Sequence, residues 1–198
     1  MPDLFTSIKE PILSRLEKEL DPRLGYHDIL HTRDVVKQAE QIAKQEGVND
    51  EHELLLLKTA AAYHDSGFLF VYKGHEEKSC EIALEDLKNV FSEPDIKKIF
   101  GMIMATKIPQ STNTLLEQII CDADLDYLGR NDFEPISGNL YKEFITFKII
   151  PEDCIWDHLQ IKFFESHHYF TKTAIEKRND IKLKHLAILK ERSNWKNE

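Results

Sequence analysis

Hydrophobic residues recur along the chain with the spacing of α-helices rather than with the alternation typical of strands. One stripe near the N-terminus rises in steps of four, and another follows it. The two stripes are Leu4, Ile8, Ile12, Leu16 and Leu20, then Val35, Val36, Ala39, Ile42 and Ala43. This spacing places the side chains on one face of a helix. Both segments are therefore predicted to be amphipathic helices.

Turn formers and helix caps divide the rest of the chain into segments of helical length. Ser92 and Asn113 are each suited to start a helix. The run FITFKII at 144–150 is the best strand candidate, but it has no partner strand, so we interpret it as a helix end or an extended linker. The pattern predicts an all-α protein of seven to nine helices. Breaks are expected at 21–22, 47–50, Gly67, 73–74, 92–94, 109–113, 129–132, Gly138 and 150–151.

The composition is that of an ordinary globular chain. Of the 198 residues, 41% are hydrophobic and 31% are charged, with 7 Gly and 7 Pro, which excludes collagen-like and disordered classes. The length predicts a single domain over residues 1–198. A formal net charge of −9 argues against nucleic acid or an anionic membrane as the main partner.

Cysteine usage and hydropathy indicate a cytoplasmic protein. Cys80, Cys121 and Cys154 are odd in number, far apart and without C-x-x-C spacing, which is typical of free thiols in a reducing compartment. The most apolar window, residues 54–63, is interrupted by Lys58 and is far shorter than a membrane span. The N-terminus lacks a basic start followed by an apolar stretch. We therefore expect neither export nor a membrane span.

Two histidines in YHDILHTRDVV supply the first candidate chemistry. His27 and His31 are four residues apart at the start of a predicted helix, so their side chains share one face. Such a pair suits a metal, or a ligand together with a proton donor. No Glu follows the first His, so the H-E-x-x-H arrangement of zinc proteases is absent.

A second candidate element is the pair His64-Asp65, which ends an apolar helix just before Gly67. A polar pair at that point either faces a cavity or is buried with a partner.

A third candidate element is IICDADLDYLG, in which three carboxylates follow an apolar run. Asp122, Asp124 and Asp126 repel one another unless a cation or several donors neutralise them. The alternatives at this point are an exposed acidic helix end and a buried, cation-bound site.

In combination, these elements resemble the HD superfamily of metal-dependent phosphohydrolases. In that superfamily a His, a His-Asp pair and a later Asp converge from separate helices on a divalent metal. YHDILHTRDVV is similar to the YHNxxHxxDV motif of the cyclic nucleotide phosphodiesterases within it, and ADL at 123–125 is similar to their ADLS segment. The resemblance implies a helical HD-domain bundle with its core at about residues 22–130 and a helical extension at about 131–198.

The resemblance also implies a role for each matching residue. His31, His64, Asp65 and Asp124 would be the metal ligands, with Asp122 as the competing fourth ligand. Asp65 would also act in catalysis by bridging to a second, weaker ion. His27 would protonate the leaving oxygen.

Other residues are implied at the substrate rather than at the metal. His75 and Glu76, in GHEEKS, match a segment that lines the site in this superfamily. Lys107, after Thr106, is either a phosphate donor or part of an ordinary surface loop. Phe68 stands where many members carry a lysine, so a lysine contact to phosphate is not implied there.

Two imidazoles and two carboxylates suit Mn, Fe, Co, Ni or Zn at the tight site, and Mg or Mn would suit a weaker second site. We therefore expect a metal-dependent phosphohydrolase or phosphodiesterase whose partner is a small phosphorylated substrate such as a nucleotide. Members of the superfamily that perform oxygenase chemistry or cleave cyclic dinucleotides carry further histidines in the interval between His75 and Asp124. This chain has none there, so the resemblance implies neither activity. The alternatives are a catalytically weak regulatory module that binds metal and nucleotide, and a helical interaction protein with incidental histidines. The sequence predicts neither the substrate nor the oligomeric state.

Overall fold

The computed structural model describes residues 4–152 and 155–195, together with the side chains of all of these except 194 and 195. Within these ranges the chain forms nine α-helices and two short 3-10 helices and contains no strand, so the all-α prediction is confirmed. The elements are α1 (Leu4–Glu19), α2 (Ile29–Gln45), α3 (Glu51–Tyr63), η1 (Ser66–Leu69), α4 (His75–Leu87), α5 (Glu93–Ala105), α6 (Leu115–Asp124), η2 (Asp126–Gly129), α7 (Phe133–Thr146), α8 (Trp156–Ser166) and α9 (Lys172–Trp195).

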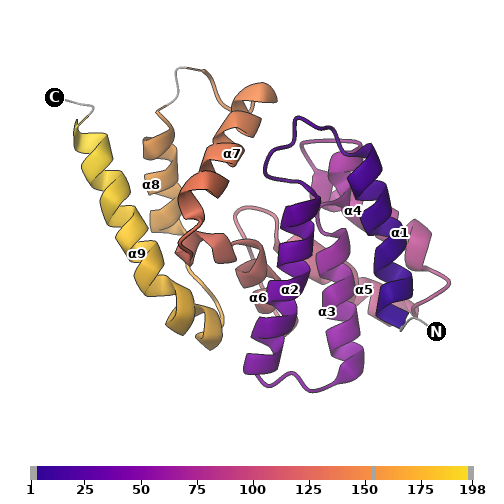
Figure 1. Ribbon diagram of the computed structural model, residues 1–198. Helices are drawn as coiled ribbons and strands as arrows, with labels where there is room; N and C mark the ends of the chain where they lie inside the picture. The colour runs from indigo at the N-terminus through magenta and orange to yellow at the C-terminus, as the bar shows by residue number, and fades with distance from the viewer. Residues whose placement is uncertain (1–3, 153–154, 196–198) are drawn as a thin grey trace.

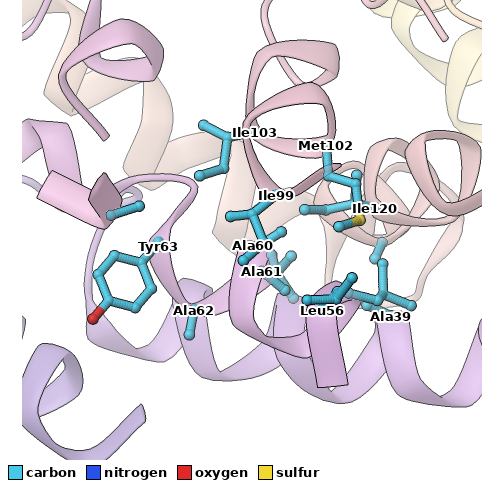
Figure 2. Packing of buried hydrophobic residues seen from close by; sticks show 14 of the residues in the cluster. Ala39, Leu56, Ala60, Ala61, Ala62, Tyr63, Ile99, Met102, Ile103 and Ile120 are labelled. Carbon is cyan, nitrogen blue, oxygen red and sulfur yellow. The ribbon is translucent and has the colours of Figure 1, made fainter. Parts of the chain in front are cut away.

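Helices α1, α2, α4, α5 and α6 surround α3, which is buried along most of its length. Its apolar run LLLLKTAAA contains three fully buried alanines, whose small side chains allow neighbouring helices to approach closely. Figure 2 shows Leu56, Ala60 and Ala61 beside side chains of α5 and α6, among them Ile99 and Ile120. This core fixes where the C-terminal ends of α3 and α6 meet.

Helices α7 to α9 lie together at one side of this bundle (Figure 1). A second hydrophobic cluster holds them there, and it includes Leu125, Leu128, Phe133, Phe164 and Leu189. The 3-10 helix η2 joins the two parts and packs against both α7 and α9.

Several local expectations can now be compared with the structure. Ser92 caps α5 as predicted. The next helix is capped by Thr114 rather than by Asn113, because Thr114 and Glu117 form a reciprocal capping box. The run at 144–150 contains the last three residues of α7 and the turn that follows the helix. The break expected at Gly138 is wrong, because Gly138 lies inside α7.

Cys80 and Cys121 are buried free thiols, as expected, whereas Cys154 lies outside the described residues. None of the helices in the described ranges combines the length and the apolar character that crossing a bilayer requires.

We predict that Gly129→Ala destabilises the junction between η2 and α9. A Cβ atom at residue 129 would lie 2.4 Å from the carbonyl oxygen of Arg178, so one of the two backbones must shift. The expected loss in the free energy of unfolding is about 1–3 kcal/mol, measured by urea denaturation.

Gly138→Ala is the matched control for this prediction. Apart from its two chain neighbours and the backbone of its own helix, no atom of the described residues lies within 4 Å of a Cβ atom added at Gly138. Because alanine favours a helix interior over glycine, this variant should gain about 0.5–1 kcal/mol. Equal effects of the two variants would show that contact with α9 is not what requires glycine at 129.

Candidate metal centre

Four side chains from separate parts of the bundle converge at one point. His31 lies in the first turn of α2, His64 and Asp65 follow α3, and Asp124 ends α6. The Nε2 atoms of the two histidines are 3.4 Å apart. Ligand atoms of His31, His64 and Asp65 all lie within 4.8 Å of one another. The Oδ1 atom of Asp124 is 3.1 Å from the Nε2 atom of His31 and 3.6 Å from that of His64.

Local hydrogen bonds orient both imidazoles. Asp28 caps α2 by accepting the backbone N–H groups of Leu30 and His31, which fixes the turn that carries His31. The Nδ1 atom of His64 lies 2.8 Å from the carbonyl oxygen of Ala61 and donates to it, so Nε2 is the nitrogen that faces the cluster. An imidazole held in this way is the usual arrangement of a metal ligand.

Ser79 of α4 fixes the backbone between α3 and η1. Its hydroxyl donates to the carbonyl oxygen of His64 at 2.7 Å and accepts the N–H of Gly67 at 2.8 Å. Gly67 is required by close packing, since a Cβ atom there would lie 2.0 Å from the carbonyl oxygen of His75. The positions of the His64-Asp65 pair and of His75 are therefore coupled.

Electrostatics within the cluster favour bound positive charge. Burial by itself would lower the pKa of His31, but the neighbouring carboxylates of Asp124 and Asp65 outweigh it and raise that pKa to about 9. Burial would raise the pKa of both carboxyls, yet the two histidines hold them low, at about 2 for Asp124 and well below the usual range for Asp65. The carboxylates therefore remain charged in the protein interior.

The donor set fits a divalent metal. The Oδ2 atom of Asp65 is buried and has no hydrogen-bond partner among the described residues. It lies 3.4 Å from the Nε2 atom of His31 and 3.2 Å from that of His64. Two imidazole nitrogens and two carboxylate oxygens around one point form a set that binds first-row transition metals.

Asp122 and Asp126 point away from this cluster. Asp122 accepts the backbone N–H groups of Phe170 and Thr171 at 2.9 and 2.7 Å, and burial raises the pKa of this carboxyl to about 6. Asp126 forms a bidentate pair with Arg178. Of the three carboxylates in this segment, the structure brings only Asp124 to the histidines.

His27 lies beside the cluster and is held by a buried glutamate of α7. The Nδ1 atom of His27 is 2.5 Å from Oε1 of Glu143. The other oxygen of Glu143 accepts the backbone N–H groups of Tyr26 and His27. The hydroxyl of Tyr72 also donates to Glu143, at 2.7 Å. Burial would raise the pKa of Glu143, but these donors, His27 first, lower it.

The sequence analysis does not identify Glu143 as a site residue, because 116 residues separate it from His27. A signal was nevertheless present, since Glu143 falls in the apolar stripe of Ile136, Leu140 and Phe147 on its helix. A carboxylate in such a stripe is buried and needs donors.

The predicted substrate-facing residues divide into two groups. His75 and Glu76 adjoin the cluster: the Nε2 atom of His75 is 3.5 Å from Oδ1 of Asp65, and Glu76 is buried. Phe68 stacks against the rings of both His27 and His75, with centroid distances of 4.2 and 4.0 Å. Lys107 is exposed and pairs instead with Glu77.

A cavity of about 530 Å³ opens from the cluster. Its lining includes His27, Asp65, His75, Glu76 and Asp124 at one end, and it continues between α7 and α8. Thr106 lines it, whereas Lys107 is not among its lining residues.

Two further histidines, His167 and His168, follow α8 outside this lining. Neither ring nitrogen of His167 has a hydrogen-bond partner in the described part of the chain. Burial, together with the nearby charge of Lys182, lowers the pKa of His167 to about 3. His167 is therefore a neutral side chain that packs against Tyr169, whereas His168 is exposed.

Residues 28–126, half of the chain, match the model of the HD domain family. This range contains His31, His64, Asp65 and Asp124, but neither His27 nor Glu143. The comparison with curated proteins gives no match.

Among solved structures, a similar one is the crystal structure of a Lactobacillus plantarum protein determined as a Northeast Structural Genomics target. It shares 19% identity with a TM-score of 0.66, over 97% of this chain and 98% of that one. At this identity the likeness shows a shared fold that includes α7 to α9.

We predict that His167→Phe reduces the loss of stability in mild acid. The unfolded chain takes up a proton on residue 167 near pH 6.5, whereas the folded chain resists it down to about pH 3, so stability falls as the pH drops below about 6.5. Between pH 7.5 and pH 5 this one group should contribute a loss of about 1–2 kcal/mol, which the variant avoids.

Urea denaturation of the metal-free protein at both pH values measures this difference. His168→Phe, which alters the exposed neighbour, should keep the loss seen in the unmodified protein. If His167→Phe loses as much stability as the unmodified protein, the burial of His167 is not the source of the acid sensitivity.

Proposed function

The chain belongs to the HD domain family, a superfamily of metal-dependent phosphohydrolases, and on this premise we propose that it hydrolyses a small phosphate ester, such as a nucleotide, through a metal-activated water. The observation that carries the proposal is the shared cavity. Two of the candidate metal ligands, Asp65 and Asp124, line the same space as His27, the residue that Glu143 holds.

His31, His64, Asp65 and Asp124 would hold the tight metal. A divalent ion bound there supplies a polarised water with a lowered pKa and withdraws charge from phosphoryl oxygens. Asp65 is suited to a further role, since its Oδ2 atom faces His31 and His64 while Oδ1 faces His75. We therefore propose Asp65 as the bridge to a weaker second site that Mg or Mn would occupy.

His27 would act as the general acid. Because a carboxylate only accepts, the Nδ1 atom of His27 carries the proton shared with Glu143, and Nε2 is the nitrogen left for the substrate. In its doubly protonated form His27 would also carry a proton on Nε2. As the water oxygen bonds to phosphorus and the ester P–O bond breaks, that proton would pass to the departing oxygen, and the proton released by the water would restore the imidazolium. Glu143 and Tyr72 keep the ring in this orientation.

The function is tested by turnover of metal-reconstituted protein with nucleotides, cyclic nucleotides and generic phosphate esters. Release of phosphate or of a monoester product is the expected result. Metal binding without turnover of any of these compounds would instead support a regulatory module.

We predict that Asp124→Ala sharply lowers metal occupancy, because it removes an oxygen that lies beside both histidines. Reconstitution with Mn followed by elemental analysis measures the occupancy per chain. Asp122→Asn is the control, since Asp122 contacts the backbone at 170–171 instead, and it should retain the metal. Full retention by Asp124→Ala would remove Asp124 from the ligand set.

We predict that His27→Ala keeps the metal but slows turnover by roughly 10²–10⁴-fold, the usual contribution of a general acid. The defect should shrink for a nitrophenyl ester, whose leaving group needs little protonation. In Glu143→Gln the ring is no longer held by a carboxylate. This variant should show a smaller loss of turnover with the same dependence on the leaving group. An equal loss for good and poor leaving groups would mean that His27 positions the substrate rather than protonating it.

A further inference from the structure

The cavity beside the candidate metal centre is much larger than a phosphate group requires. Its volume of about 530 Å³ falls in the range of sites that enclose whole organic ligands. His27, Asp65 and Asp124 occupy one end, so a phosphate bound there would leave most of the space to the rest of the ester.

The far part of the cavity is apolar and largely aromatic. Its side chains come from η2, α7 and α8, and they include Leu128, Phe133, Leu140, Phe144, Trp156 and Phe163. The transfer of a hydrocarbon group from water into such surroundings is favourable. The hydroxyl groups of a sugar would lose water there and find few partners, which is unfavourable.

One buried polar network interrupts this lining and has one side-chain amide nitrogen without a partner among the described residues, and the exposed Lys162 also borders the cavity. The indole N–H of Trp156 donates to the hydroxyl of Ser137 at 3.1 Å, and that hydroxyl donates to the side-chain oxygen of Gln160. Gln160 is 6% exposed, and its Nε2 atom has no hydrogen-bond partner among the described residues. Ser137, Trp156 and Gln160 all line the cavity, so an acceptor on a ligand could complete the network.

We propose that the organic part of the substrate is a bulky aryl or alkyl group with one hydrogen-bond acceptor, which lies between α7 and α8 with its acceptor at Gln160. The inference rests on the proposed phosphohydrolase function for the position of the phosphate. It assigns substrate specificity to α7 and α8, which lie outside the residues matched by the family model. A nucleoside is the competing occupant, because its base is aromatic but its ribose is polar.

Direct binding tests the cavity without any catalysis. The probe is 2-naphthalenemethanol, added to metal-free protein while tryptophan fluorescence is followed. Saturable quenching is expected, and its loss in Trp156→Phe would assign the signal to the cavity. Leu140→Arg, which places a charge in the lining, should weaken binding at least tenfold. Thr146→Arg adds the same charge at an exposed position of the same helix and should not.

A second variant guards against a folding defect in Leu140→Arg. Leu140→Phe keeps the lining apolar but reduces its volume. It should weaken binding of 2-naphthalenemethanol more than binding of benzyl alcohol. Equal effects on the two alcohols, with circular dichroism unchanged, would show that they bind elsewhere.

Turnover by metal-reconstituted protein tests the substrate class. The compounds are 2-naphthylmethyl phosphate and adenosine 5′-monophosphate, which both release a primary alcohol and so differ little in leaving group. We expect kcat/KM to be at least tenfold higher for the naphthyl ester. An equal or higher value for the nucleotide, with adenosine displacing the naphthyl alcohol, would overturn the proposal in favour of a nucleoside.

The two proposals fail in different ways. Ester hydrolysis without saturable binding of 2-naphthalenemethanol would reject the apolar substrate and leave the phosphohydrolase function standing. Saturable binding that responds to Leu140→Arg, without hydrolysis of any phosphate ester, would reject the proposed function and leave an apolar ligand site.

Discussion

Compensation of buried negative charge is the constraint on which the rest of this structure depends. Asp65 and Asp124 remain charged in the interior, where an unpaired carboxylate would be very costly. Each is accommodated because imidazole nitrogens of His31 and His64 lie within 3.6 Å. The ends of α3 and α6 must therefore meet the start of α2, and the alanine-rich core around α3 allows this approach. A divalent ion would satisfy the same constraint more completely than protons do.

A third buried carboxylate links the C-terminal helices to this centre. Glu143 is 1% exposed and is surrounded by donors from Tyr26, His27 and Tyr72. Helix α7 thereby orients a side chain at the cavity while also forming part of the cavity wall. Residues beyond the family match consequently shape both the surroundings of His27 and the space beside it. Proton transfer and the choice of organic group would then depend on the same helix.

The sequence predicts features that have a local physical cause. The helical stripes and the Ser92 cap depend on neighbouring residues, and the structure contains them. The break expected at Gly138 is wrong, because glycine costs a helix only about 1 kcal/mol and α7 is held by its packed apolar face. The capping position moved from Asn113 to Thr114 because only Thr114 has Glu117 three residues later.

The sequence by itself determined the helical class of this protein and, through the spacing of its His and Asp residues, the set of side chains from which a metal centre could be built. Only the tertiary structure decided which of them meet. Asp122 and Asp124 are two residues apart on one helix and so point in nearly opposite directions, and the packing of α6 turns Asp124 to the histidines. The contact between His27 and Glu143 spans 116 residues, and no local pattern specifies such a pair, because it exists only once both helices are packed.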